Sequence, residues 1–359
     1  MLRFVGKRLL YGLLVLLGVV TLVFFLFNIL PGDPARMMLG QRADQESIDI
    51  INRDLGRDKP VGLQYLNYLN DLAPISFHNN DDPANYFYLS PDKYAPYTTL
   101  LRLGTTSVVL KAPYLRRSYQ SQRKVSEIIG AAFPQTAMLA VVAMALALAL
   151  GITFGVLSAL FKDTWVDRAL LFFSTLGMSL PSFFAAILIA WLFAYVLADW
   201  TGLNMFGNLY SVDDYGTGEY VDLKNLILPA LTLGIRPLAT LTQLTKNSML
   251  EALSQDYIRT ARAKGLSHGR VVVHHALRNA LNPVVTSASG WLASLLAGAV
   301  FVEYVFDWKG MGVVIVDGLE KYDFPVVMGT ILFICVLLVL INILTDILYG
   351  VLDPRVRVQ

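Results

Sequence analysis

Apolar residues run along this chain in long stretches that shorter polar segments separate. Six stretches come close to or exceed the roughly 20 apolar residues that a helix needs to cross a bilayer. They cover approximately residues 9–30, 136–161, 169–198, 226–244, 284–305 and 326–349. The pattern predicts an all-α polytopic membrane protein with about six transmembrane helices.

The composition agrees with a membrane protein. The 359 residues are 55% hydrophobic and only 16% charged, and the mean hydropathy is +0.53, which is too apolar for a soluble domain of this length. The single cysteine, Cys335, lies in the last apolar stretch, where we expect a buried thiol. The net charge of +2 says little by itself, and the sequence shows no pattern typical of nucleic-acid binding.

The first apolar stretch follows Arg3, Lys7 and Arg8, as in a secretory signal. It is about 22 residues long, however, which exceeds the apolar part of a signal peptide, and no small-x-small cleavage site follows it. Residues 1–30 are therefore predicted to be a short tail and an uncleaved first span.

The positions of the basic residues predict the orientation. Thirteen of them lie near the two termini, after the second stretch and in the central polar segment: Arg3, Lys7, Arg8, Lys162, Arg168, Lys246, Arg259, Arg262, Lys264, Arg270, Arg278, Arg355 and Arg357. The two short connections on the other side carry only Lys224, Lys309 and Lys321. Short segments rich in lysine and arginine remain on the cytoplasmic side of the membrane, so both termini are predicted to be cytoplasmic.

The long segment at residues 31–134 is predicted to be extracytoplasmic. Loops longer than about 60 residues cross a membrane largely regardless of charge, so its basic residues do not oppose this assignment. Residues 45–55 and 61–72 are expected to form short helices, and the residues that follow contain turn signals.

The central polar segment covers residues 249–283. Residues 250–264 contain neither proline nor glycine and are mostly good helix formers. Gly265 can adopt the left-handed conformation that ends a helix, and Ser267 can cap the next one. The apolar stripe of this second helix is predicted to comprise Val273, Ala276, Leu277 and Ala280. The segment is thus predicted to be two short helices with a hinge at Gly265.

The polar segment has the features of a docking surface. The second helix should present His274, Arg278 and Asn282 on its polar face. Pro283 is expected to end that helix, because proline disfavours helical geometry at the preceding residue. In the first helix, Ala261 and Gly265 share one face, which is bare enough for another backbone to come close. The alternative is a basic amphipathic helix that rests on lipid headgroups.

Two apolar stretches contain features that packing alone does not explain. Pro181 frees a backbone carbonyl that needs a partner. We therefore predict that Met178, Ser179 and Ser182 line a pore. Arg236 lies within the fourth stretch, where a charge is costly and typically faces a cavity or a partner charge. It either contacts substrate or pairs inside the helix bundle, and Gln243 continues a polar line from it.

Motifs for catalysis are missing from the sequence. It contains no Gly-x4-Gly-Lys-Ser/Thr phosphate loop, no His-Glu-x-x-His and no Gly-x-Ser-x-Gly. The four histidines are not spaced with carboxylates as metal ligands are: His78, His268, His274 and His275. We expect neither ATP hydrolysis nor another catalytic activity in this chain, and no cofactor or metal of its own.

At the polar segment the chain resembles a known family. Asp256–Leu266 and His275–Pro283 resemble the cytoplasmic EAA loop of ABC importer permeases, in particular the peptide/nickel branch. Arg259, Thr260 and Arg278 stand where the general pattern has a glutamate, an alanine and a proline, and such departures are common in that branch. Further resemblances lie at residues 31–34, 303–312, 319–326 and 349–355.

The resemblance implies an ABC importer type I permease fold. Its membrane core would be residues 135–350, with a cytoplasmic tail at 351–359. The loop at 247–283 would couple the core to an ATPase subunit. The coupling residues would be Asp256, Arg259, Thr260, Ala261, Arg262, Ala263, Lys264, Gly265, His275 and Arg278.

The resemblance also bears on three features outside the loop. Glu303 would be a structural residue at the outer rim, with a role in a gate as the alternative. Asp346 is expected to pair with a cytoplasmic arginine. Residues 74–121 look like an insertion relative to the family. They would cap the pore or contact a substrate-delivery protein, or merely decorate the outer face.

The resemblance implies a permease subunit of an ATP-driven importer for peptides or a related solute, multi-pass in the bacterial cytoplasmic (inner) membrane. The expected partners are a second permease, two ATPase subunits that bind ATP and Mg, an external solute-binding protein and membrane lipid, but no nucleic acid. The alternative is a secondary transporter or channel without an ATPase. Such proteins usually carry several ionisable groups at the membrane midplane, where here only Arg236 qualifies. The motifs do not name the cargo.

Overall fold

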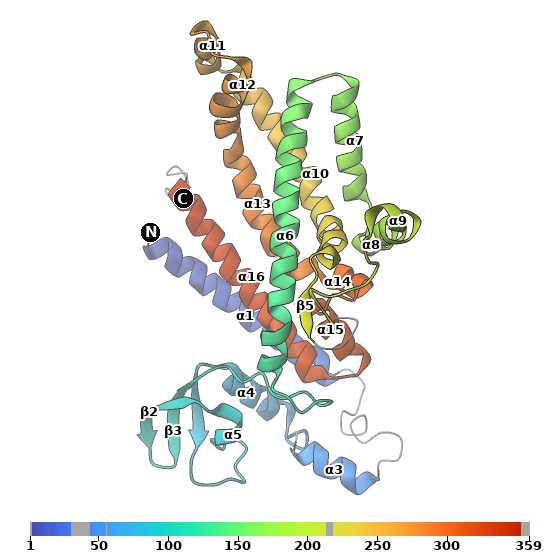
Figure 1. Cartoon of the computed structure of the whole chain (residues 1–359). Coiled ribbons are helices and arrows are strands. Elements are labelled where there is room, and N and C mark those ends of the chain that lie inside the picture. The colour runs from blue at the N-terminus through green and yellow to red at the C-terminus, as the bar shows by residue number, and fades with distance from the viewer. Residues whose placement is uncertain (1, 30–43, 55, 213–217, 353–359) are drawn as a thin grey trace. The chain divides into compact units, whose positions relative to one another are not determined.

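The computed structural model describes residues 2–29, 44–54, 56–212 and 218–352. The chain forms two compact units. The first consists of Met1–Leu9, Ala132–Val313 and Leu337–Gln359, and the second of Leu10–Ala131 and Val314–Val336. Long helices make up most of the first unit, and the second combines helices with a small sheet (Figure 1).

Long helices of the first unit run side by side (Figure 1). They are α6 (Val125–Leu160), α7 (Trp165–Ser179), α10 (Lys224–Ser254) and α13 (Arg278–Gly298). Shorter elements connect or extend them: α8 (Ser182–Trp191), π-helix η1 (Leu192–Val196), α9 (Ala198–Thr201), strands β4 (Tyr210–Val212) and β5 (Glu219–Val221), α11 (Asp256–Ala263), α12 (His268–Arg270), π-helix η2 (Val271–Leu277) and α14 (Val300–Phe306). α15 (Met311–Glu320) begins in this unit and continues into the second.

Small residues allow α6 and α10 to lie close together. A Cβ atom at Gly234 would lie 2.9 Å from the carbonyl oxygen of Ala143, and one at Gly151 would lie 2.9 Å from the Cβ of Leu241. The core of this unit also buries Leu139, Leu233 and Val284. Inside a membrane the hydrophobic effect does not bring helices together, so close van der Waals packing of this kind stabilises their association instead. Any larger side chain at these glycines would push the two helices apart.

Spans three and five are bent, a feature about which the sequence prediction said nothing. α7 meets the helix Ser182–Val196, which is α8 with η1, at 115°, and the helix His268–Leu296 meets α14 at 57°. Within the described residues, four helices are long and apolar enough to cross a membrane, and up to six spans result if each bent pair counts as one. The first bend falls at Pro181, which the sequence already marks as unusual, whereas the residues around the second bend are apolar or small and give no such signal.

The expectation that Pro283 ends a helix is wrong. α13 runs straight through Pro283, and α10 contains Pro229 and Pro237 in the same way. Membrane helices tolerate proline where neighbouring helices or local adjustments satisfy the freed carbonyl group. The predicted second polar helix and the fifth span are therefore one continuous helical rod.

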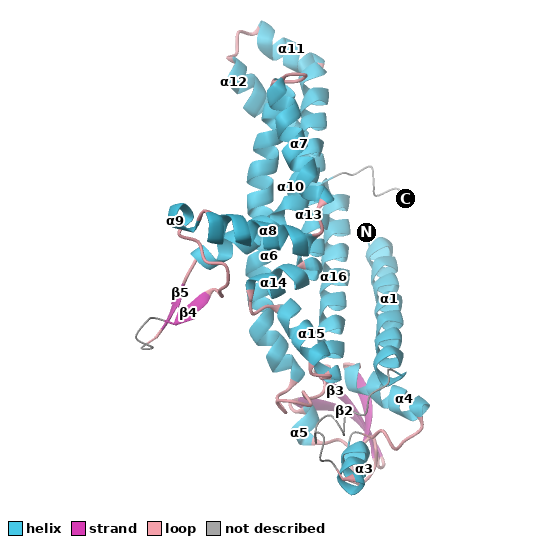
Figure 2. Cartoon of the chain, turned by 90° about the vertical axis from the view of Figure 1, so that its right-hand side faces the viewer, coloured by secondary structure: helices cyan, strands magenta, loops and turns pink. Residues whose placement is uncertain are grey.

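The second unit contains a three-stranded antiparallel sheet, whose strands are visible in Figure 2. β3 (Thr106–Lys111) lies between β1 (Ile75–Asn79) and β2 (Tyr97–Leu103). Its helices are α3 (Gln45–Asp54), α4 (Val61–Leu72) and α5 (Pro91–Tyr94), with parts of α1 (Leu2–Ile29) and α16 (Phe324–Leu352). α3 and α4 confirm the two predicted helices. The predicted turn at residues 31–34 lies outside the described residues.

The sheet was not predicted because its polarity is inverted. The buried positions of β1 and β3 are largely polar: Ser76, His78, Ser107 and Lys111. The exposed positions of the sheet are apolar: Ile75, Phe77, Leu101 and Leu110. An ordinary half-buried strand shows the opposite arrangement. The all-α prediction thus holds for the membrane helices but missed the small sheets.

Candidate functional site

The polar segment forms a bent protrusion, which we call the elbow and define as residues 255–270. α10 ends at Ser254, Gln255 is extended, and α11 then runs to Ala263. Gly265 has a φ of +76°, which confirms the predicted left-handed hinge. Ser267 occupies the capping position of α12, although its side chain makes no capping hydrogen bond. Figure 1 shows α11 and α12 at one end of the helices of this unit.

The break at Gln255 corrects the predicted single helix over residues 250–264. Ala252 in α10 and Ile258 in α11 are both buried in one apolar cluster. Residues six apart lie on different faces of a straight helix. The extended residue between the helices returns the apolar side of α11 to this cluster.

Ala261 is buried within the chain itself, at 5% exposure. It packs in the cluster formed by α10, α11 and η2, which also contains Met249, Val271, Val272 and Ala276. The prediction that its small side chain leaves a bare face for a partner is therefore wrong. Its size instead allows α11 to lie close to the rest of its own unit.

Most of the other predicted coupling residues lie on the outside of the elbow, and His275 and Arg278 follow it on η2 and α13. The exposed ones are Asp256, Arg259, Thr260, Arg262, Ala263, Lys264, Gly265 and Arg278, and His275 is half-buried. Arg259 Nη1 lies 3.2 Å from Asp256 Oδ1, an exposed ion pair that contributes little stability. Thr260 Oγ1 donates to the carbonyl oxygen of Asp256 at 3.0 Å. The elbow thus has an apolar inner side and a polar outer side.

A π-helical turn shifts the register after α12. Val272, Ala276 and Ala280 are buried, whereas Val273 is 57% exposed. The predicted stripe included Val273 because it assumed 3.6 residues per turn throughout. The π-helix η2 has a wider turn, so a spacing of four residues continues along one face. His274 and Asn282 are exposed as predicted.

A buried ion pair, which the sequence analysis missed, lies at the base of this end of the unit. Lys246 Nζ on α10 donates to both oxygens of Asp167 on α7, at 2.7 and 2.9 Å. Asp167 also accepts hydrogen bonds from Ser158 on α6 and from the backbone N–H of Asp163. The pair ties α6, α7 and α10 together. Its partners are 79 residues apart, and no local sequence pattern connects them.

The predicted pore residues do not form one cluster. Ser182 and Arg236 line the same cavity, of about 70 Å³. Ser179 lies instead on a shallow groove along α7 that also includes Thr175. Gln243 Nε2 reaches that groove and donates to Thr175 Oγ1 at 3.3 Å. Met178 is 46% exposed and lines neither of these hollows.

Arg236 has neither a hydrogen bond nor an ion pair with another residue in the part of the chain that the structure describes. The expectation that it pairs inside the bundle of its own subunit therefore finds no support among the described residues. It remains a charged side chain on a cavity wall within a span.

Glu303 has a structural position in the first unit. Its side chain is fully buried, and it accepts hydrogen bonds from Thr136 Oγ1 on α6 and from the N–H of Gly312, both at 2.6 Å. Thr136 Oγ1 in turn accepts from the N–H of Met311 at 2.8 Å. These bonds hold the turn after α14 against α6. The side chain of Asp346 lies outside the described residues.

The second unit has a polar cluster around Asp71. Tyr94 Oη donates to Asp71 Oδ1 at 2.7 Å, and Arg116 Nε lies 3.5 Å from Asp71 Oδ2. Lys111 Nζ donates to the carbonyl oxygen of Asp71 at 2.6 Å. Burial lowers the pKa of Lys111 to about 8. Burial, together with the charge of Lys111, lowers the pKa of His78 to about 4.

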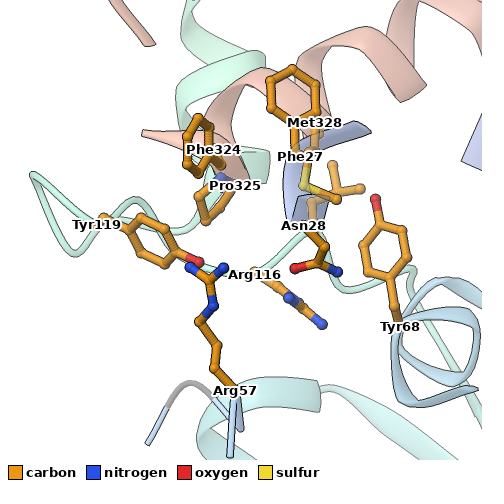
Figure 3. A pocket seen from close by; sticks show the side chains of 11 residues that line it. Phe27, Asn28, Arg57, Tyr68, Arg116, Tyr119, Phe324, Pro325 and Met328 are labelled. Carbon is orange, nitrogen blue, oxygen red and sulfur yellow. The ribbon is translucent and has the colours of Figure 1, made fainter. Parts of the chain in front are cut away.

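A small hollow adjoins this cluster. Its volume is about 20 Å³, and Figure 3 shows the guanidinium groups of Arg57 and Arg116 beside Tyr119, Tyr68 and Asn28. Arg116 also lies over the ring of Tyr68, at 5.0 Å from its centre. The hollow has room for about one water molecule. None of the residues that the sequence singled out as a site lies in it.

The family assignment follows from comparison with known proteins. Residues 151–358 match the model of the binding-protein-dependent transport system inner membrane component, and residues 1–81 match the model of the N-terminal part of such a membrane component. The chain therefore belongs to this family, the permease subunits of ABC importers, and is a multi-pass protein of the bacterial inner membrane.

Relatives of known name match along the full chain. The di/tripeptide transport system permease protein DppB of Pseudomonas aeruginosa is 35% identical, with 100% of both chains covered. The dipeptide permease DppB of Alkalihalophilus pseudofirmus is 32% identical, with 99% of this chain and 100% of the relative covered. The glutathione permease GsiC of Pectobacterium atrosepticum is 35% identical, with 99% of each covered.

A solved structure shows the same fold. An inward-facing structure of the MetNI methionine ABC transporter matches with a TM-score of 0.50 and 16% sequence identity, over 64% of this chain and 97% of that chain. The predicted type I permease fold is thereby confirmed. Members of this family act as transport subunits alongside ATPase and substrate-binding partners.

Proposed function

We propose that this chain is the permease subunit of an importer for short peptides, and that the elbow transmits ATPase movement to it. The cargo is inferred from the relatives, two of which are named for dipeptides or di- and tripeptides and one for glutathione, itself a small peptide. A second permease would complete the pore. Two ATPase subunits would hold ATP and Mg, and an external binding protein would deliver the peptide.

The proposed membrane topology of the chain is based on the distribution of its basic residues. Both termini and the loop at 247–283 would be cytoplasmic, and residues 31–134 would be extracytoplasmic, because short basic segments stay inside. The sheet of the second unit lies within residues 74–121, the part that resembles an insertion. We assign this part to capping the pore or contacting the binding protein, rather than to simple decoration.

The observation that carries the proposal is the two-sided build of the elbow. Its apolar side is packed against its own unit through Ile258 and Ala261, and its polar side is exposed from Asp256 to Arg270. A segment that only rested on lipid would direct its apolar side to the membrane, but here that side is already covered. The exposed polar side is therefore available to a protein partner.

The elbow is connected to the cavity by two rigid helices. α10 leads from the elbow to Arg236, and the rod of η2 and α13 leads from it to Trp291 and Ser294, which line the same cavity. A push on the elbow would move both cavity walls. Alternating access requires the pore to switch between two conformations. Closure of the ATPases on nucleotide would favour one of them by moving the elbow and these two helices.

The test uses an exposed elbow residue, because Ala261 would report on internal packing instead. Ala263→Trp places a bulky ring on the outside of the elbow, where Ala263 is exposed. We expect normal membrane insertion, loss of ATPase co-purification in mild detergent and at least tenfold slower ATP-driven dipeptide uptake. Ala131→Trp, at an exposed position outside residues 74–121, serves as the matched control. It should show normal membrane insertion, normal ATPase co-purification and normal uptake.

Two outcomes would overturn the proposal. Normal ATPase binding and uptake in the Ala263→Trp variant would exclude the elbow as the docking site. Dipeptide uptake driven by an ion gradient in vesicles that contain this chain without ATPase subunits would exclude the importer mechanism and favour a secondary transporter.

A further inference from the structure

The cavity between α8, α10 and α13 is lined by a charged side chain that has no ion-pair partner among the described residues. Arg236 lies inside α10, within an apolar span, and it lines the cavity of about 70 Å³. No carboxylate forms an ion pair with it in the described part of the chain. A cationic side chain at membrane depth is costly, and such residues typically face a cavity that serves substrate or ions.

The lining of the cavity combines polar and aromatic groups. Hydroxyl groups come from Ser182 on α8, Thr232 on α10 and Ser294 on α13, and Trp291 supplies an aromatic wall. Thr232 Oγ1 already donates to the carbonyl oxygen of Leu228 at 2.8 Å, so its lone pairs rather than its proton are free. Ser182 and Ser294 therefore offer the remaining hydroxyl donors.

The bend between α7 and α8 places the N-terminal end of α8 at the cavity, which makes the electrostatic potential there more positive. α8 begins at Ser182, which lines the cavity, and the first N–H groups of a helix lack partners within it. The N-terminal end of a helix carries a partial positive charge. Arg236 and this helix end therefore give the cavity a positive potential with no anion of the described chain to balance it.

The size of the cavity limits what can enter. Its volume is several times the roughly 10–15 Å³ that one water molecule needs. It accommodates a small group such as a carboxylate, but it is too small for a whole dipeptide. The rest of such a ligand would extend from the exposed side of Arg236.

We propose that Arg236 binds the terminal carboxylate of the transported peptide and thereby favours cargo with a free acid end. Arginine is suited to this role because its planar guanidinium group can donate two parallel hydrogen bonds to a carboxylate. Ser182 and Ser294 would donate to the same group. This inference rests on the proposed function, since it names which end of the proposed peptide cargo the permease recognises.

The test compares one dipeptide with a free carboxylate and the same dipeptide with a C-terminal amide. Both are chosen because the binding protein binds them with a measured affinity. Initial rates of ATP-driven uptake are recorded in proteoliposomes at saturating peptide concentrations. The binding protein is the same in every sample, so its own preference cancels when variants are compared. We expect Arg236→Gln to lower the acid-to-amide rate ratio at least tenfold.

Two further variants sharpen the test. Arg236→Lys keeps the charge but loses the planar fork, so it should give an intermediate ratio. Arg123→Gln removes an exposed arginine that lies outside residues 74–121, and it should leave the ratio unchanged. ATP hydrolysis by the assembled complex is measured in parallel, because a peptide-binding role predicts normal assembly in all three variants.

The possible failures are distinct. If the wild-type complex transports neither peptide, the proposed function fails. If Arg236→Gln slows both peptides equally, or leaves the ratio unchanged, transport stands and carboxylate recognition is excluded. If Arg236→Gln prevents assembly with the second permease, then Arg236 is a pairing residue between subunits and the inference is overturned.

Discussion

The elbow and the outer sheet are built with opposite polarity. The elbow buries Ile258 and Ala261 and exposes its charged residues. The sheet buries His78 and Lys111 and exposes apolar residues such as Phe77. In the elbow, apolar packing supplies stability and the charges remain free for a partner. In the sheet, hydrogen bonds and ion pairs around Asp71 must hold the interior, so its stability depends on charge.

The largest expected effect is the loss of Asp71 from the interior of the second unit. Asp71→Asn keeps the shape but leaves Arg116 without its carboxylate partner, whereas the hydrogen bond from Lys111 to the backbone carbonyl oxygen at position 71 remains. Removing one partner of a fully buried ion pair typically costs about 3–5 kcal/mol, and the cost here should be smaller because the Arg116 side chain is 28% exposed. Hydrogen exchange in the full chain should therefore accelerate strongly in β1 and β3.

Asp81→Asn is the matched control for this change. Asp81 pairs with Arg102 on the surface, and exposed pairs contribute about 1 kcal/mol or less. Equal exchange rates in the two variants would show that the Asp71 cluster does not hold the sheet together.

The second prediction concerns pH. The pKa of His78 is lowered to about 4 in the folded chain, against an ordinary value of 6.5, so the unfolded state binds more protons between these values. Stability is therefore complete above pH 6.5 and falls as the pH decreases toward 4. The loss reaches about 3 kcal/mol, since each pH unit between the two values contributes about 1.4 kcal/mol.

Hydrogen exchange of the sheet as a function of pH, corrected for intrinsic exchange, measures this loss. His78→Asn should remove the dependence over this window, whereas His268→Asn, on the exposed elbow, should retain it. Retention of the full dependence in the His78→Asn variant would assign it to another group.

The same contrast explains what the sequence could predict. Gly265, the helices α3 and α4 and the exposed charges of the elbow follow from local rules, and the structure confirms them. The sheet was not predicted because strands are recognised in a sequence by apolar residues on their buried face, and the buried face of this sheet is largely polar. The π-turn, which moved Val273 outward, also has no local signal.

Long-range contacts account for the remaining differences. Asp167 and Lys246 are far apart in sequence, and so are Ser182 and Arg236, so only the packing of α7, α8 and α10 brings each pair together. Ala261 was read as a partner-facing residue because a small side chain suits any close approach. Which helix comes close, its own or another subunit's, depends on the tertiary fold.

The smallest expected effect tests whether the hinge of the elbow is fixed by backbone geometry alone. A Cβ atom at Gly265 would meet nothing within 4 Å, so Gly265→Ala causes no clash and only strains the backbone at a φ of +76°. That strain costs about 1 kcal/mol. Gly269 has equally open surroundings but no positive φ, so Gly269→Ala should be neutral or slightly stabilising. Faster exchange in α11 and α12 for the first variant alone would confirm the hinge. Equal rates would mean that the buried contacts of Ile258 and Ala261, rather than the turn, set the angle of the elbow.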